Sequence, residues 1–125
     1  MDTGRTAKPN VVKDKSFAFA LRVVKLAKNL QDEKREFVLS RQVLRSGTAV
    51  GALVREAEHA QSRADFISKM SIALKEANET DYWIDVLHQS GLITQEDHGS
   101  MHPDVQELIK LLVAIVKTSK AGIGQ

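Results

Sequence analysis

Two carboxylate–histidine pairs have the residue types and the spacing that a metal site or an acid–base catalyst would need. Glu56 precedes His59 by three positions, and Asp85 precedes His88 by the same spacing. A Glu-x-x-His motif on two helices of a bundle is typical of di-iron carboxylate sites. Helical periodicity, however, turns Glu56 and His59 more than ~100° away from the apolar stripe of their helix, and the other helices carry apolar residues at their inward positions. We therefore expect no metal site, with His59 on the surface and His88 partly buried.

The acidic residues offer no better catalytic arrangement. They form a run at Glu76, Glu79, Asp81 and Asp85, spread over two faces of a predicted helix, which is typical of a solvated surface with cross-helix partners. The chain has no cysteine, and no turn motif presents a serine or threonine nucleophile. We expect a protein that is not an enzyme and has no cofactor.

Basic side chains are better organised. One stripe of the second predicted helix carries three arginines together with small or polar residues. Successive members of the stripe are alternately four and three positions apart: Arg41, Arg45, Thr48, Ala52, Arg55 and His59. A row of guanidinium groups at helical pitch suits a phosphate backbone. No aromatic residues interleave, so base stacking is not indicated. The candidate nucleic-acid-binding residues are Arg22, Lys25, Lys28, Arg41, Arg45 and Arg55. The alternative is a surface that forms salt bridges with the acidic run.

Charge is divided unevenly along the chain. Residues 1–62 contain twelve Lys/Arg against seven Asp/Glu, whereas residues 63–125 contain six against nine, so the net charges are +5 and −3. Such asymmetry indicates either a partner-seeking basic face or two halves that neutralise each other when packed. No signal peptide is evident, and the longest strongly apolar run, Leu111 to Val116, is far short of the ~20 residues that span a bilayer. We expect a cytoplasmic protein without membrane contact.

The elements that must position these residues are helical throughout. Apolar periodicity predicts helices over about residues 15–30, 32–60, 62–89 and 103–119. Asp32 is the expected cap of the second helix, and Pro103 the expected first residue of the fourth, after a short turn capped by Thr94 and Asp97. The expected fold is all-α, an up-down-up-down antiparallel four-helix bundle over residues 13–120. Residues 1–12 and 121–125 are expected to be a flexible arm and tail.

Two glycines interrupt the second helix at positions 47 and 51. Each costs roughly 1 kcal/mol relative to alanine in a helix interior. A phosphate-binding loop would need a preceding strand, and a membrane helix-pairing motif would need an apolar helix; the sequence provides neither. Ser46, Gly47 and Gly51 are therefore predicted to let a neighbouring helix pack closely.

The predicted bundle has more apolar surface than it can bury. The apolar arc of the first helix, which includes Phe19, covers more than half the circumference, and Trp83 lies on a flank of the third helix away from its main stripe. Phe19 and Trp83 are the expected contacts between subunits of a homo-oligomer.

Three segments resemble a known family. "FAFALRVVKLAKNL", "EFVLSRQVLRSGTAVGALVREAEHAQSRADFISKMSIALKEANETDYWIDVL" and "LIKLLVAIVKTS" closely resemble the bacterial four-helix-bundle family of 23S ribosomal RNA intervening-sequence proteins, which includes the accessory variability determinant of diversity-generating retroelements. The resemblance covers about residues 12–119. It implies an up-down bundle that assembles as a barrel-like homopentamer with a basic surface. It also implies non-enzymatic association with nucleic acid and, for the retroelement branch, with a reverse transcriptase.

The family pattern matches this chain at small and basic positions, and departs from it once. The matching positions are Arg41, Arg45, Ser46, Gly47, Thr48, Gly51, Ala52, Glu56 and Lys69. The departure is "DHGSMHPDV", where Gly99 and Pro103 interrupt a fourth helix that the family commonly keeps continuous, so a kink or break is expected. Two functions stay open: an oligomeric nucleic-acid-binding protein that contacts phosphates, and a scaffold that binds an acidic or nucleoprotein partner such as a reverse transcriptase.

Overall fold

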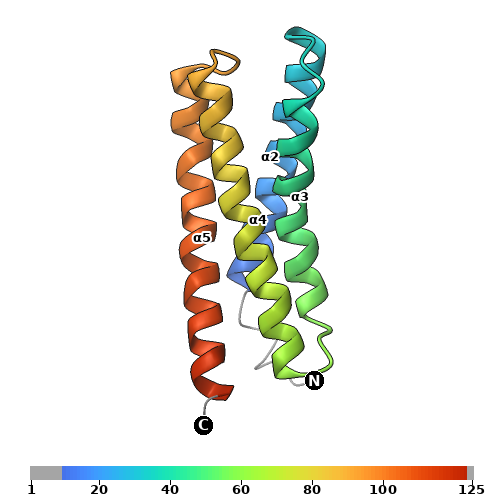
Figure 1. Ribbon diagram of the computed structural model, residues 1–125, viewed down its shortest axis with the longest axis vertical. Coiled ribbons are helices and arrows are strands. Elements are labelled where there is room, and N and C mark those ends of the chain that lie inside the picture. Colours follow the sequence, from blue (N-terminus) through green and yellow to red (C-terminus); the bar gives the residue numbers. More distant parts are fainter. Residues whose placement is uncertain (1–9, 124–125) are drawn as a thin grey trace.

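Within the described part of the chain, four antiparallel helices form a bundle (Figure 1). The computed structural model describes residues 10–123, and its helices are α2 (Val11–Glu33), α3 (Leu39–Ala57), α4 (Arg63–Gln89) and α5 (Gln95–Ile123). The predicted all-α, up-down-up-down bundle is confirmed. Most of the expected N-terminal arm lies outside the described residues, but Val11 and Val12 already belong to α2, and α5 extends into the expected tail. Within residues 10–123, no helix has an apolar stretch long enough to cross a membrane.

The core runs along the axis of the bundle and draws on every helix. Its largest fully buried side chains are those of Phe19, Leu30, Ile84, Leu87, Leu108 and Leu112. Phe19 was expected at a subunit interface, and that expectation is wrong, because its side chain is 2% exposed and packs within the single chain. The apolar arc of α2 is wide enough that one stripe fills the core while a neighbouring stripe reaches solvent.

Small residues bring α2 and α3 close together. A Cβ atom added at Gly47 would lie 2.8 Å from both Cγ atoms of Val23, and one at Gly51 would lie 3.3 Å from the backbone oxygen of Ser16. Ser46 is fully buried on the other side of α3, where its hydroxyl accepts a 2.9 Å hydrogen bond from Thr80 of α4. This stretch of α3 therefore packs closely against two helices at once.

The α2–α3 connection differs from the prediction. Asp32 does not cap α3, since α2 continues through it to Glu33. Arg35 then adopts a left-handed φ of 54°, the conformation usually taken by glycine after a helix, and the backbone N–H of Glu36 donates to Leu30. The Glu36 carboxylate accepts from the backbone N–H groups of Leu39 and Ser40 at 3.0 and 2.8 Å, and thus caps α3.

The start of the last helix also differs. Thr94 and Asp97 form a reciprocal capping box, as predicted, but the helix that they cap does not stop at a short turn. α5 begins at Gln95 and continues through Gly99 and Pro103, so the prediction that Pro103 begins the helix is wrong, and no break occurs there. A proline inside a helix lacks one backbone donor and disturbs the carbonyl groups of the preceding turn. For Pro103 the carbonyl that loses its donor is that of Gly99, and the Arg22 guanidinium donates to the next carbonyl, that of Ser100, at 3.2 Å.

Candidate nucleic-acid interface

The predicted arginine stripe lies on the outside of α3, but its members differ in their partners. Arg41 and Arg55 are exposed, and the structure gives neither an ion pair within residues 10–123. Arg45 is bound by two carboxylates of α4: it donates to Glu76 at 3.2 Å and also to Glu79. The hydrogen bond to Glu79 raises the pKa of Arg45, and Trp83 Nε1 and Arg45 together lower the pKa of Glu79. Arg45 is thus tied to α4.

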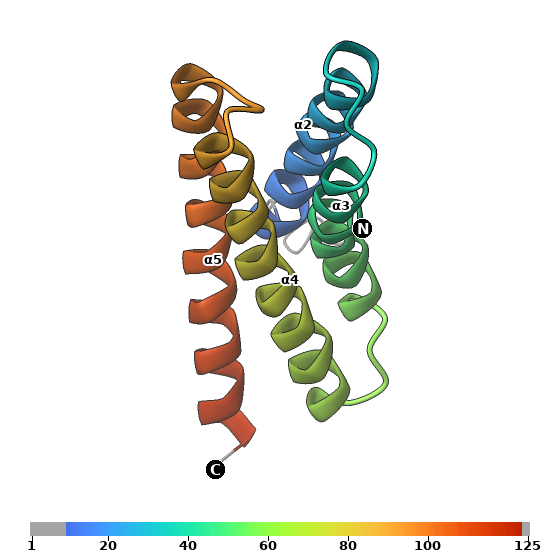
Figure 2. The ribbon, with the colours of Figure 1, turned by 45° about the horizontal axis from the view of Figure 1, so that its top comes forward.

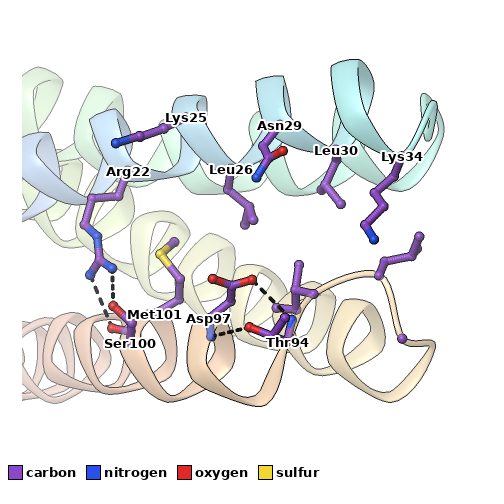
Figure 3. A pocket seen from close by; sticks show the side chains of 13 residues that line it. Arg22, Lys25, Leu26, Asn29, Leu30, Lys34, Thr94, Asp97, Ser100 and Met101 are labelled. Atoms are coloured by element: carbon purple, nitrogen blue, oxygen red, sulfur yellow. Dashed lines mark hydrogen bonds between the residues drawn. The ribbon is translucent and has the colours of Figure 1, made fainter.

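Arg22 is likewise engaged within the molecule. Its guanidinium forms an ion pair with Asp104 and donates to both the carbonyl and the hydroxyl of Ser100 on α5, two of the bonds being drawn in Figure 3. These bonds join α2 to α5 beside Pro103. Arg22 therefore stays a predicted contact for a nucleic acid, and a phosphate there would compete with a carboxylate, a carbonyl and a hydroxyl.

Other ion pairs also join the basic half of the chain to the acidic half. Lys15 of α2 lies 3.2 Å from Glu107 of α5, so a cation of the basic half meets an anion of the acidic half. The 3.8 Å pair of Lys69 in α4 with Glu56 in α3 has the opposite sense. The charge asymmetry of the sequence is therefore partly neutralised by packing, which was one of the two interpretations left open. What matters for a charged partner is the set of cations that remains.

Within residues 10–123, exposed cations without a carboxylate oxygen within 4.0 Å lie on all the described helices. Five lie on α4 and α5: Arg63, Lys75, Lys110, Lys117 and Lys120. Six lie close together in the chain, on α2, α3 and the connection between them: Lys25, Lys28, Lys34, Arg35, Arg41 and Arg55. Lys34 and Arg35 were not among the predicted residues. Both follow Lys28 within seven positions, which was the signal in the sequence. They were passed over because they lie where one predicted helix ends and the next begins. We call these six residues the basic set.

A cleft opens beside part of the basic set. The two helix pairs, α2 with α3 and α4 with α5, diverge toward the end that carries the α2–α3 and α4–α5 connections (Figures 1 and 2). A cleft of about 570 Å³ lies there, with Lys25 and Lys34 on the α2 side and Asp97 on the other (Figure 3). Leu26, Ile93 and other apolar residues line it.

A second hollow, of about 530 Å³, lies between α2 and α3 on the outer face. It includes Phe17, whose ring lies 5.6 Å below the Arg55 guanidinium carbon. Phe17, Leu21 and Val24 follow one another at helical spacing and are about half exposed, so they form an apolar stripe on α2 that the single chain does not cover. Trp83, the other predicted interface residue, is half-buried, and its Nε1 donates to Glu79 within α4.

The two carboxylate–histidine pairs do not come together. Glu56 and His59 line the α2–α3 hollow, near the end of α3, where Glu56 pairs with Lys69 from the beginning of α4. Asp85 and His88 lie near the end of α4, and there they meet His98 of α5 instead. His98 and His102 were not among the residues that the sequence pattern marked. Their spacing of four would have marked them, had the region been recognised as helix.

Comparisons with known proteins bear on this arrangement. A family model described as 23S rRNA-intervening sequence protein matches residues 8–114. The fold is similar to a crystal structure of a protein of unknown function from the S23 ribosomal protein family of Bacteroides thetaiotaomicron, with 57% sequence identity and a TM-score of 0.84. That match covers 85% of this chain and 98% of the other. None of the curated protein sequences matches this chain significantly.

Proposed function

Because the chain belongs to the 23S rRNA-intervening sequence protein family, we propose that it is a non-enzymatic, oligomeric protein that binds the phosphate backbone of a nucleic acid. The contacts would be made by the basic set on α2, α3 and their connection.

The observation that carries this proposal is the gathering, on α2, α3 and the segment between them, of six exposed cations without an ion pair in the described part of the chain. α4 and α5 carry five such cations, but α4 also carries the acidic run of Glu76, Glu79, Asp81 and Asp85. Unpaired Lys and Arg side chains retain the charge that releases counterions from a nucleic acid. Arg41 and Arg55 add planar donors that fit phosphate oxygens in pairs. The segment also holds Asp32 and Glu33, so the proposed attraction is moderate for one chain and depends on several chains acting together.

A second candidate function has its own observation. The apolar stripe of Phe17, Leu21 and Val24 beside the α2–α3 hollow favours contact with protein. A second copy of the chain would satisfy it in an oligomer. The alternative is a scaffold whose basic set binds an acidic or nucleoprotein partner, such as the reverse transcriptase that the family resemblance implies.

A filter-binding titration with charge reversals tests the proposal. The variant Lys28→Glu/Arg41→Glu should weaken binding to unrelated RNA and DNA sequences by a similar factor, because phosphate contacts carry no base information. Removal of one phosphate contact should flatten the dependence of log K on log salt by about 0.9 for duplex DNA or 0.7 for single strands. Titrations at two or more salt concentrations measure this slope.

Two further variants serve as controls. Lys110→Glu/Lys117→Glu changes the net charge by the same amount on exposed positions of α5, and we expect it to change affinity less. Arg45→Gln removes a cation that is already paired, and we expect it to leave the salt slope unchanged. Equal binding by the wild type and the Lys28/Arg41 reversal, or no binding by the wild type at low salt, would contradict the proposal and favour the scaffold.

A further inference from the structure

Three histidine rings stack on the surface where α4 meets α5. The ring centroids of His88 and His98 are 4.5 Å apart with planes inclined by 26°, and those of His98 and His102 are 5.0 Å apart with planes inclined by 13°. His88 comes from the end of α4, whereas His98 and His102 come from the first part of α5. Neither the family description nor the basic set accounts for this cluster, which is independent of the proposed function.

Three potential ligand atoms converge in the cluster. Asp85, His98 and His102 each offer one, and these atoms all lie within 4.8 Å of one another. His98 and His102 are four positions apart on one helix, so their rings project from the same face of α5, and Asp85 faces them from α4. The His98 Nε2 atom already lies 2.8 Å from Asp85 Oδ1. We propose that Asp85, His98 and His102 form a binding site for a divalent transition-metal ion, with zinc as the type case.

The ligand types decide which class of ion fits. Imidazole nitrogens are preferred by zinc, nickel and copper, whereas calcium and magnesium take mainly oxygen ligands. Two imidazoles and one carboxylate are the ligand set of several zinc sites that keep a fourth position open for water. Asp85 is exposed, and His98 and His102 are half-buried, so an ion in solution can reach the cluster.

A second carboxylate orients one of the ligands. Asp81 Oδ1 lies 2.8 Å from His102 Nδ1, and Gln106 Nε2 donates to Asp81 Oδ2 at 2.8 Å. When Nδ1 is the donor in that bond, the Nε2 lone pair of His102 is left to face an ion. A carboxylate behind a metal-bound histidine is a common second layer of metal sites, because it holds the ring in place and makes the ligand nitrogen more basic. Asp81 is therefore a positioning residue in this proposal.

Binding requires the side chains of the cluster to rearrange. Zinc–nitrogen bonds are about 2.0–2.1 Å, which puts two ligands of a tetrahedral site about 3.4 Å apart. The hydrogen bond between His98 and Asp85 would open from 2.8 Å to about that separation, so that both atoms bind the ion instead of each other. The nearly parallel rings of His98 and His102 would also have to turn out of their stack, because imidazole lone pairs lie in the ring plane and must converge on the ion.

Isothermal titration of the full chain with Zn²⁺ alone, in chelator-treated buffer, tests the site. We expect saturable binding of one ion per chain. His98→Gln, His102→Gln and Asp85→Asn should each weaken the affinity at least tenfold, while His59→Gln, at an exposed position just after α3 and outside the cluster, should leave it unchanged. Asp81→Asn should weaken binding less than removal of a ligand, since it removes only the orienting bond.

Thermal unfolding provides a second readout. Zn²⁺ should raise the melting temperature of the wild type and of His59→Gln, and a chelator should reverse the rise. His98→Gln and His102→Gln should melt cooperatively yet show no such rise, which separates loss of the ion from failure to fold. No saturable binding by the wild type, or unchanged affinity in His98→Gln and His102→Gln, would overturn the proposal and leave the histidine stack as a helix-to-helix contact only.

Discussion

At the scale of single residues, four arginines of α2 and α3 fall into two groups according to the acceptors within their reach. Arg22 and Arg45 bind carboxylates on neighbouring helices, while Arg41 and Arg55 extend from α3 without an ion pair in the described part of the chain. Helical spacing placed Arg41, Arg45 and Arg55 on one stripe. It could not separate them, because their partners Glu76 and Glu79 are brought there by the register of α4 against α3.

Gly47 is a residue at which packing should outweigh helix propensity. An alanine would gain up to about 1 kcal/mol of propensity. Its Cβ would lie 2.8 Å from both Cγ atoms of Val23, a fully buried, β-branched side chain with little freedom to turn. Overpacking of this kind typically costs about 1–3 kcal/mol, so we expect Gly47→Ala to lower the free energy of unfolding by up to about 2 kcal/mol in urea denaturation.

Gly99 is the matched control for that prediction. It lies within α5, and nothing is within 4 Å of a Cβ atom built there. Gly99→Ala should therefore raise the free energy of unfolding by about 0.5–1 kcal/mol. If both substitutions stabilised the protein, α2 and α3 would not pack as closely as the structure places them.

At the scale of the helices, the Glu36 carboxylate holds the beginning of α3. Burial alone would raise its pKa, but the backbone N–H groups of Leu39, Ser40 and Val38 outweigh this and lower the pKa below the ordinary value of 4.5. A carboxyl group whose pKa is lower in the folded state stabilises the fold above its unfolded pKa. That contribution is lost as the pH falls through the folded pKa.

Glu36→Gln should therefore unfold more easily than the wild type at neutral pH, by about 1 kcal/mol for a lost cap. The difference should shrink as the pH falls below about 4.5, the ordinary value for the group. Urea denaturation at several pH values measures both effects. Glu33→Gln is the control, since Glu33 ends α2 exposed and makes no ion pair within residues 10–123. A difference that stayed constant with pH would show that the Glu36 charge is not part of the cap.

Helix interiors could be predicted from the sequence, whereas three helix boundaries could not. Apolar periodicity marks every core stripe, because each helix must bury one face. After the end of α2, Arg35 has a backbone conformation typical of glycine. The cap of α3 is Glu36, which lies two residues before the N-cap position. α5 continues through Pro103, beside which Arg22 of α2 donates a hydrogen bond. Propensity argues against each of these, and tertiary contacts override it.

One boundary error had a functional consequence. With the last helix expected to begin at Pro103, His98 and His102 fell before the predicted start of that helix, and their spacing carried no meaning. In the structure they share one face of α5 and meet Asp85 of α4. The convergence also depends on the α4–α5 register, which sequence periodicity does not specify.

At the scale of the whole molecule, the α2–α3 pair and the α4–α5 pair differ in charge. Ion pairs between them contribute to their packing. Ion pairs link α2 to α5 through Lys15 and Arg22, and α3 to α4 through Arg45. Exposed pairs of this kind contribute little stability each and are screened by salt. The basic set is therefore what remains on α2 and α3 after internal neutralisation, and its effect grows with the number of chains that present it together.

Assembly should depend on the apolar stripe of α2. Leu21 is 57% exposed between Phe17 and Val24, a continuous surface that a second chain would cover. The family resemblance implies a homopentamer, so light scattering at micromolar concentration should give about five times the 13.8 kDa of one chain. Leu21→Asp places a charge in the middle of the stripe and should reduce the mass toward that of one chain, because burying an unpaired carboxylate opposes association.

Val113→Asp is the matched control for Leu21→Asp. Val113 is 45% exposed on α5, a different helix from the one that carries the stripe, so a comparable change of charge and volume there should leave the oligomer intact. Circular dichroism of both variants separates dissociation from unfolding. If the wild type itself gave the mass of one chain, the apolar stripe would not be a subunit contact. Nucleic-acid binding would then have to come from the basic set of a single chain, with correspondingly weaker affinity and a shallower dependence on salt.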